Sequence, residues 1–401
     1  MMAVTPRPIE EALKHSAPAA RGRMPRQCQS RQRLTVKESG NRAFAVRADW
    51  RPGWPANQRL LERFALLGAL LFACAAQPAL AEGQAAPGEV TGAKLLSHPG
   101  WFKESFLDLT EDVSEAADEG KHVILFMEMN GCPYCYKMVQ ENFANAPYRD
   151  FIQAHFDVIA LNTKGDREVA VTEEMSMTEK EVADVYQVRF TPTLIFLDES
   201  NKPVARVSGY RNPDDFKVVL DYVQNKAYRH QSLNDFAAAR LAAAVYSFRE
   251  HPMIRSVDDL SGVVDRPLAV LFEDAACVAC DALHDGHLAD PEVRRILGGL
   301  TLVRLDTDSE TPIVDPMGNQ TTPKALAEAL GIQYRPSIVL FDRGREITRI
   351  ESMLYRYHFA GVLEYVAGRH YERYPDSPFD YIDVKTAELT AAGKDVAIAD
   401  E

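Results

Sequence analysis

The chain has 401 residues, a net charge of −13 and the composition of an ordinary globular protein, which allows two or three domains. Its charge is unevenly placed. Residues 1–63 hold 13 Lys/Arg and 5 Asp/Glu, a net of +8, so the remainder carries −21 (−13 minus 8). An acidic body argues against nucleic acid or an anionic membrane surface as a partner.

The basic N-terminal part ends in a predicted signal peptide. Residues 1–58 form a basic, unpatterned leader, and a start site assigned too far upstream explains it better than an organelle transit peptide does. In residues 59–81, two arginines precede the apolar run Phe64–Ala76, and Ala79-Leu80-Ala81 fits a cleavage site. The run is short for a bilayer span. We therefore expect export to the periplasm, a mature start at Glu82 and no stable membrane insertion after cleavage.

The cysteines become informative once the signal is removed. Cys28 and Cys74 precede the cleavage site, and the other four form two C-x-x-C pairs, Cys132/Cys135 and Cys277/Cys280. An exported chain without further cysteines has no structural disulfide framework, so these thiols are predicted to serve redox chemistry or metal binding.

A first unit is predicted over residues 94–230, after a flexible lead over residues 82–93. The buried strand His122–Met127 leads to the first cysteine pair, which starts a helix reaching about Glu141. Thr178 and Glu181 form a capping-box pattern at a later helix. The other predicted elements are helices over 147–155, 178–188 and 213–225, strands over 156–161, 193–197 and 203–208, and a polar excursion over 164–176.

The second unit, residues 257–374, repeats the order of the first. A connector over residues 231–256 contains a predicted helix, Ser232–Arg249, and a surface tail is expected over residues 375–401. From the second cysteine of each pair to the next key proline there are 57 residues in one unit (135 to 192) and 56 in the other (280 to 336). We therefore predict an internal duplication of an α/β fold, each copy a mixed sheet flanked by helices.

Two thiols separated by two residues at the start of a helix can bridge, and a helix N-terminus favours a thiolate. The spacing predicts Cys132 and Cys277 as exposed attacking thiols and Cys135 and Cys280 as resolving thiols. Glu273, Asp274 and Asp281 flank the second pair, and nearby carboxylates disfavour a thiolate. Cys277 is therefore expected to react more slowly than Cys132.

The strand, the cysteine pair and the distant proline resemble the thioredoxin superfamily. Residues 100–230 resemble the exported thioredoxin of bacterial sulfur-oxidation clusters, through the segments 126–135, 161–169, 190–198 and 207–210. Residues 263–370 more weakly resemble the C-terminal domain of the transmembrane thiol-reductant conductor, through the segments 277–280 and 290–293. The resemblance implies two tandem thioredoxin-like folds. It also implies that Pro192 and Pro336 are cis and lie beside the cysteines, with Thr191 and Arg335 offering backbone to a bound peptide.

Both units depart from the thioredoxin pattern. Phe126 and Leu271 occupy the position of the usual buried aspartate, and each unit instead has a glutamate four residues before its first cysteine, Glu128 and Glu273. These glutamates are either proton-transfer groups for the resolving cysteine or solvated carboxylates at a strand end, and the sequence favours neither. Arg335 is likewise either a salt-bridged residue or a selector of acidic partners.

Metal binding is the main rival for the second pair, because Cys277, Cys280, His284 and His287 have zinc-like spacing. Four ligands on one short helix would make a poor tetrahedron, so we expect no metal and two exposed histidines. No cofactor is expected.

The leading function is an exported thiol–disulfide oxidoreductase that reduces disulfides of periplasmic proteins. Its partners would be protein thiols and disulfides, with a membrane thiol-reductant conductor as the source of electrons. The alternatives are a disulfide oxidase or isomerase, and a binding or chaperone module in which only the first site is active.

Overall fold

The computed structural model of the protein describes residues 86–238, 240 and 246–399. The predicted leader and signal peptide, with Cys28 and Cys74, lie outside the described residues. None of the helices in the described part combines the length and the apolar character needed to cross a bilayer.

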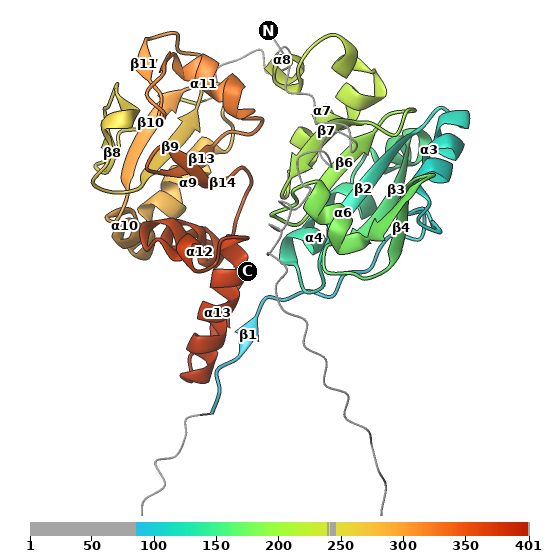
Figure 1. Ribbon diagram of the computed structural model, residues 1–401, viewed down its shortest axis with the longest axis horizontal. Helices are drawn as coiled ribbons and strands as arrows, with labels where there is room; N and C mark the ends of the chain where they lie inside the picture. Colours follow the sequence, from blue (N-terminus) through green and yellow to red (C-terminus); the bar gives the residue numbers. More distant parts are fainter. Residues whose placement is uncertain (1–85, 239, 241–245, 400–401) are drawn as a thin grey trace, which may run out of the picture. The chain divides into compact units, whose positions relative to one another are not determined.

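The first half is built on a four-stranded mixed sheet in the order β3-β2-β6-β7 (Figure 1). β2 pairs parallel with β3 and antiparallel with β6, and β6 pairs antiparallel with β7. The strands are β2 His122–Glu128, β3 Phe156–Asn162, β6 Thr193–Leu197 and β7 Pro203–Ser208.

The central strand β2 is apolar because both faces of the sheet are covered. Ile124 and Phe126 pack into one hydrophobic cluster, while Val123, Leu125 and Met127 pack into another. Alternating residues of a strand point to opposite faces, so a run that is apolar throughout belongs in the middle of a covered sheet.

The helices of the first half start where the sequence supplies caps. Thr178 and Glu181 form the predicted capping box at α6, and the Asn212 side chain caps α7. The helix bearing the first cysteine pair, α4, continues as a π-helical turn, η1. The α-helices are α3 Leu109–Asp118, α4 Pro133–Met138, α5 Arg149–His155, α6 Glu179–Val185 and α7 Pro213–Gln224, with η1 at Val139–Ala144 and a 3-10 turn, η2, at Ala227–Arg229.

The second half repeats this sheet and adds one strand, giving the order β14-β13-β9-β10-β8. β9 pairs parallel with β10 and antiparallel with β13, as β2 does with β3 and β6, which is the arrangement expected of a duplicated unit. The strands are β8 Ile254–Arg255, β9 Leu268–Glu273, β10 Thr301–Asp306, β13 Ser337–Asp342 and β14 Arg345–Ile350. The helices are α9 Cys280–Asp285, α10 Pro291–Leu297, α11 Pro323–Leu330 and α12 Arg356–Ala367. Short elements are η3 Leu260–Gly262, η4 His287–Ala289, η5 His370–Glu372, β11 Ile313–Val314 and β12 Gln320–Thr321.

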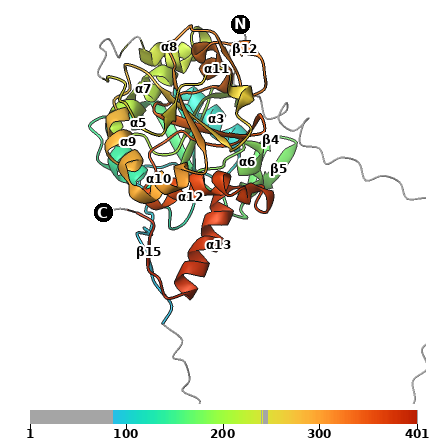
Figure 2. The ribbon, with the colours of Figure 1, turned by 90° about the vertical axis from the view of Figure 1, so that its left-hand side faces the viewer.

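Three predicted segments that flank the two units differ from the structure. The helix predicted over Ser232–Arg249 is described only as α8, Leu233–Ala238, and residues 246–250 are not helical. The predicted tail contains a capped helix, α13 Pro378–Ala391, and a strand, β15 Val396–Ala397. β15 pairs with β1, Val90–Thr91, within the segment predicted as a flexible lead, and the two strands lie side by side in Figure 2. Pairing between distant parts of the chain orders segments whose local sequence is weakly patterned.

The polar excursion predicted over residues 164–176 is largely an antiparallel ribbon of β4 Glu168–Thr172 and β5 Met175–Thr178. Val169 and Val171 are its buried residues. At its base, the buried Glu179 carboxylate accepts hydrogen bonds from the Asn162 N–H at 2.8 Å and from Arg167 Nη2 at 2.6 Å.

Removing the Glu179 carboxylate is expected to destabilise the protein in a pH-dependent way. Burial opposes ionisation, but the hydrogen bonds from Arg167 and Asn162 outweigh it and lower the pKa of Glu179. Because the pKa of Glu179 is lower in the folded than in the unfolded protein, the carboxylate stabilises the fold fully at pH values above the unfolded-state pKa. This stabilisation is lost as pH falls through the folded-state pKa. In urea unfolding, Glu179→Gln should lose about 1–3 kcal/mol near pH 7 and less in acid. The exposed Glu174→Gln is the control, and an equal loss for Glu179→Gln at both pH values would contradict the assignment.

Candidate functional site

The first cysteine pair lies directly after the central strand β2, at the start of α4. Cys132 and Cys135 form a disulfide with a Cα–Cα distance of 5.3 Å. Cys132 is the N-cap residue, and its Sγ accepts a hydrogen bond from the Cys135 N–H at 3.0 Å. Pro133 occupies the first turn, where its missing N–H costs nothing. The start of α4 therefore directs a hydrogen-bond donor at Cys132 Sγ, the sulfur expected to carry negative charge.

The Thr191-Pro192 loop lies beside this pair, as the resemblance implied. The Thr191-Pro192 peptide bond is cis. The Thr191 hydroxyl lies 3.4 Å from Cys132 Sγ and the Thr191 carbonyl oxygen lies 3.6 Å from it. The loop and Cys132 are thus in direct contact.

The second pair occupies the equivalent place after β9 but has a different helix start. Cys277 and Cys280 form a disulfide with a Cα–Cα distance of 5.5 Å. α9 begins only at Cys280, and its N-cap residue, Ala279, provides no side-chain cap. The prediction that both pairs open a helix in the same way is therefore wrong for Cys277.

The first cysteines are also less accessible than predicted. Cys132 and Cys277 are each 3% exposed, and Cys135 and Cys280 are fully buried. The sequence could not reveal this, because exposure of a cysteine at a strand end depends on which loops pack over it.

Arg335 is an ion-paired residue. Its Nε donates to Asp274 Oδ2 at 2.5 Å, and the Arg335-Pro336 peptide bond is cis. The buried Asp274 also accepts hydrogen bonds from Thr307 Oγ1 at 2.9 Å and from the Ala276 N–H at 3.0 Å. Asp274 therefore connects the proline loop, the residue that follows β10 and the segment before Cys277.

The carboxylates around the second pair have basic partners, which removes the charge argument for a slow Cys277. Asp274 pairs with Arg335, and the Asp281 carboxylate lies 3.4 Å from the Arg249 guanidinium. An ion-paired carboxylate repels a thiolate less than an unpaired one. The different positions of Cys132 and Cys277 relative to the helix start are therefore the stronger reason to expect different reactivities of the two pairs.

Both predicted glutamates pair with a histidine, but in different surroundings. His98 Nε2 lies 2.7 Å from Glu128 Oε2, and the two side chains are 34% and 13% exposed. His284 Nε2 lies 2.8 Å from Glu273 Oε1, and these side chains are 2% and 0% exposed. The view of Glu273 as a solvated strand-end carboxylate is therefore wrong. So is the prediction that His284 and His287 are exposed, because His284 is buried and His287 is half-buried.

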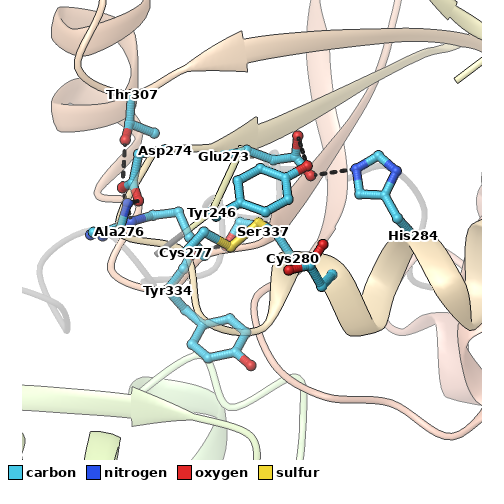
Figure 3. Close-up of a disulfide and its surroundings, with 12 residues drawn as sticks. Tyr246, Glu273, Asp274, Ala276, Cys277, Cys280, His284, Thr307, Tyr334 and Ser337 are labelled. Atoms are coloured by element: carbon cyan, nitrogen blue, oxygen red, sulfur yellow. Dashed lines mark hydrogen bonds and ion pairs between the residues drawn. A yellow bond between two sulfur atoms is a disulfide. The ribbon is translucent and has the colours of Figure 1, made fainter. Parts of the chain in front are cut away.

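Tyr246 is a residue of the second site that sequence reasoning missed. Tyr246 packs against Cys277 and Cys280, and its hydroxyl donates to Glu273 Oε2 at 3.3 Å (Figure 3). Burial and the neighbouring Glu273 raise the pKa of Tyr246 to about 12. Tyr246 fell inside the predicted connector helix, so no local signal pointed to it.

The structure offers no support for zinc at the second pair. His284 lies within hydrogen-bond distance of Glu273. His287 lies on the separate turn η4, and its Nε2 is 2.8 Å from the Leu354 carbonyl oxygen. Within residues 86–238, 240 and 246–399, no group of three or more His, Cys, Asp or Glu side chains is arranged to hold a metal ion.

Comparisons with known proteins agree with this architecture. A family model described as a thioredoxin-like domain matches residues 109–224 and 263–367, more than half of the chain. No curated protein matches.

Solved structures that match include a thioredoxin-fold protein from Helicobacter pylori, 25% identical over 31% of this chain and 81% of its own, with a TM-score of 0.28. A thioredoxin from Thermus thermophilus is 24% identical over 29% of this chain and 83% of its own, with a TM-score of 0.24. A poplar thioredoxin h is 17% identical over 36% of this chain and 100% of its own, with a TM-score of 0.22.

Proposed function

The chain belongs to the thioredoxin-like domain family, and from this we propose that it is a thiol–disulfide oxidoreductase with two redox centres, Cys132/Cys135 and Cys277/Cys280. One observation carries the proposal: each half of the duplicated fold holds a disulfide-bonded C-x-x-C pair directly after its central strand.

The exchange at the first pair follows from its geometry. In the reduced protein, the Cys132 thiolate attacks a substrate disulfide, forms a bond to one sulfur and releases the other as a thiolate, which takes a proton from solvent. Cys135 then loses its proton and attacks Cys132 Sγ, so that the Cys132–Cys135 disulfide forms and the second substrate thiolate leaves. Two electrons pass from the protein to the substrate. The Cys135 N–H that bonds Cys132 Sγ stabilises the attacking thiolate.

The contact of Thr191 with Cys132 supports a role for the proline loop in substrate binding. An extended substrate segment that brings its disulfide to Cys132 Sγ would contact the Thr191 backbone, because the Thr191 carbonyl oxygen lies 3.6 Å from that sulfur. At the second site, Arg335 is tied to Asp274, so this loop presents an ion pair where the first presents a hydroxyl.

We further propose that the protein works as a reductase in the periplasm, charged by a membrane thiol-reductant conductor and acting on exported proteins with cysteines. The resemblances of the two halves and the predicted signal peptide support this direction and location. A C-x-x-C protein can also oxidise or isomerise disulfides, and its reduction potential decides among these roles.

A redox titration of the purified mature protein tests the proposal. With alkylation and mass spectrometry as the readout, we expect two reversible two-electron couples between about −270 and −120 mV. Cys132→Ser with Cys135→Ser should remove one couple, and Cys277→Ser with Cys280→Ser the other. Values near the negative end favour a reductase. Bound zinc in place of a couple would indicate metal handling, and client binding that survives loss of all four thiols would indicate a binding module.

A further inference from the structure

The second cysteine pair lies beside a buried polar cluster formed by Glu273, His284 and Tyr246 (Figure 3). Glu273 and His284 are held 2.8 Å apart with side chains 0% and 2% exposed. Desolvation of a buried ionisable pair can cost more than the attraction between its members returns, so such a pair is weak evidence of a purely stabilising role. A role in the chemistry of the neighbouring disulfide would account for it.

The cluster is built around the cysteines by three separate elements. Glu273 ends β9, four residues before Cys277, and His284 lies one turn after Cys280 on α9. The Tyr246 ring packs against both cysteines while its hydroxyl reaches Glu273 Oε2. Figure 3 shows the disulfide beside the Tyr246 ring, with a ring nitrogen of His284 turned toward the Glu273 carboxylate.

Few other ionisable groups face the cluster in the described part of the chain. Arg304 Nε on β10 lies 3.9 Å from Glu273 Oε2, and the His251 ring lies 6.3 Å from the His284 ring. Asp285 follows His284 but turns to Arg249, at 2.7 Å. The Glu273 carboxylate therefore meets three hydrogen-bonding or charged partners, of which Arg304 is the most distant.

We propose that His284 is a positioning residue for thiol–disulfide exchange at the second pair: it holds the buried Glu273 carboxylate as the proton acceptor for Cys280. The inference rests on the proposed function.

In the resolving step, Cys280 gives its proton to the Glu273–His284 pair and attacks Cys277 Sγ. The Cys277–Cys280 bond forms, the bond between Cys277 and the substrate sulfur breaks, and the substrate thiolate takes a proton from solvent. The reverse sequence returns the proton to Cys280 when the disulfide is reduced. Tyr246 keeps water from the cluster and holds the second carboxylate oxygen.

The first half contains a matched pair that lacks this isolation. Glu128 occupies the position of Glu273, but its partner His98 is about one-third exposed and comes from the segment before the sheet. Solvent reaches His98, so water can accept the proton of Cys135 without help from this histidine. His98 is therefore the internal control for His284.

The experiment measures each pair alone in the full mature protein. A Cys132→Ser/Cys135→Ser background isolates the second pair, and rates of substrate disulfide reduction are recorded from pH 5 to 9. We expect His284→Gln and Glu273→Gln each to slow the second pair by about a hundredfold and to give the same altered pH profile. Combining them should cost little more than either alone, because the two side chains act as one unit. Tyr246→Phe should slow it less.

His98→Gln, in the Cys277→Ser/Cys280→Ser background, should change the first pair by less than about threefold. A pH profile of His284→Gln identical to that of the unsubstituted second pair would overturn the inference. If His284→Gln does not fold, Glu273→Gln and Tyr246→Phe decide the question by the same profile. Absence of exchange at both pairs would defeat the proposed function itself, whereas exchange at the second pair with a rate and pH profile unchanged by His284→Gln and Glu273→Gln would defeat only this inference.

Discussion

Cys132→Ser is expected to lower protein disulfide reduction at the first pair by at least about a thousandfold, because the thiolate is the nucleophile and serine cannot replace it. The Cys277→Ser/Cys280→Ser background isolates this pair. Cys135→Ser should instead retain the first attack and accumulate a mixed disulfide between Cys132 and the substrate, visible by mass spectrometry under non-reducing conditions.

The reciprocal protein, Cys132→Ser/Cys135→Ser, tests whether the first pair is the faster centre. We expect the first pair to react faster because Cys132 Sγ accepts a hydrogen bond from the Cys135 N–H at the start of α4. Cys277 does not lie at a helix start, since α9 begins only at Cys280. Full activity from the second pair alone, with none from the first pair alone, would contradict this ranking.

Asp274→Ala is expected to lower the free energy of unfolding by about 3 kcal/mol and to slow exchange at the second pair. The buried carboxylate neutralises the mostly buried Arg335 and accepts hydrogen bonds from Thr307 and Ala276. Removing it leaves a buried guanidinium without its partner and releases the proline loop from the segment that carries Cys277. Urea unfolding gives the stability, and disulfide reduction in the Cys132→Ser/Cys135→Ser background gives the rate.

Asp285→Ala is the matched control, because its side chain is 67% exposed and its ion pair with Arg249 lies at the surface. Its loss should be below about 1 kcal/mol. Arg335→Ala combined with Asp274→Ala should cost less than the sum of the single changes. A loss for Asp274→Ala no larger than that for Asp285→Ala would show that the ion pair does not hold the site together.

Much of the architecture could be read from local patterns. The strands β2 and β9 have apolar interiors, and the capping box at Thr178 marks a helix start. The nearly equal spacing between cysteines and prolines indicates the duplication. The ribbon over Glu168–Thr178 was missed although its alternation was present, because its short polar stretches resemble a loop. The pairing of β1 with β15 joins segments about 300 residues apart and leaves no local trace.

The sequence by itself indicated the fold, the two C-x-x-C pairs and the two proline loops, because repeated motifs at matching spacings can be recognised without knowing which segments pack together. The tertiary structure decided what surrounds them. It paired Arg335 with Asp274, buried His284 against Glu273 and laid Tyr246 over the second disulfide. Whether a carboxylate or an imidazole faces water or a partner depends on which distant segments pack over it, and spacing along the chain does not encode that.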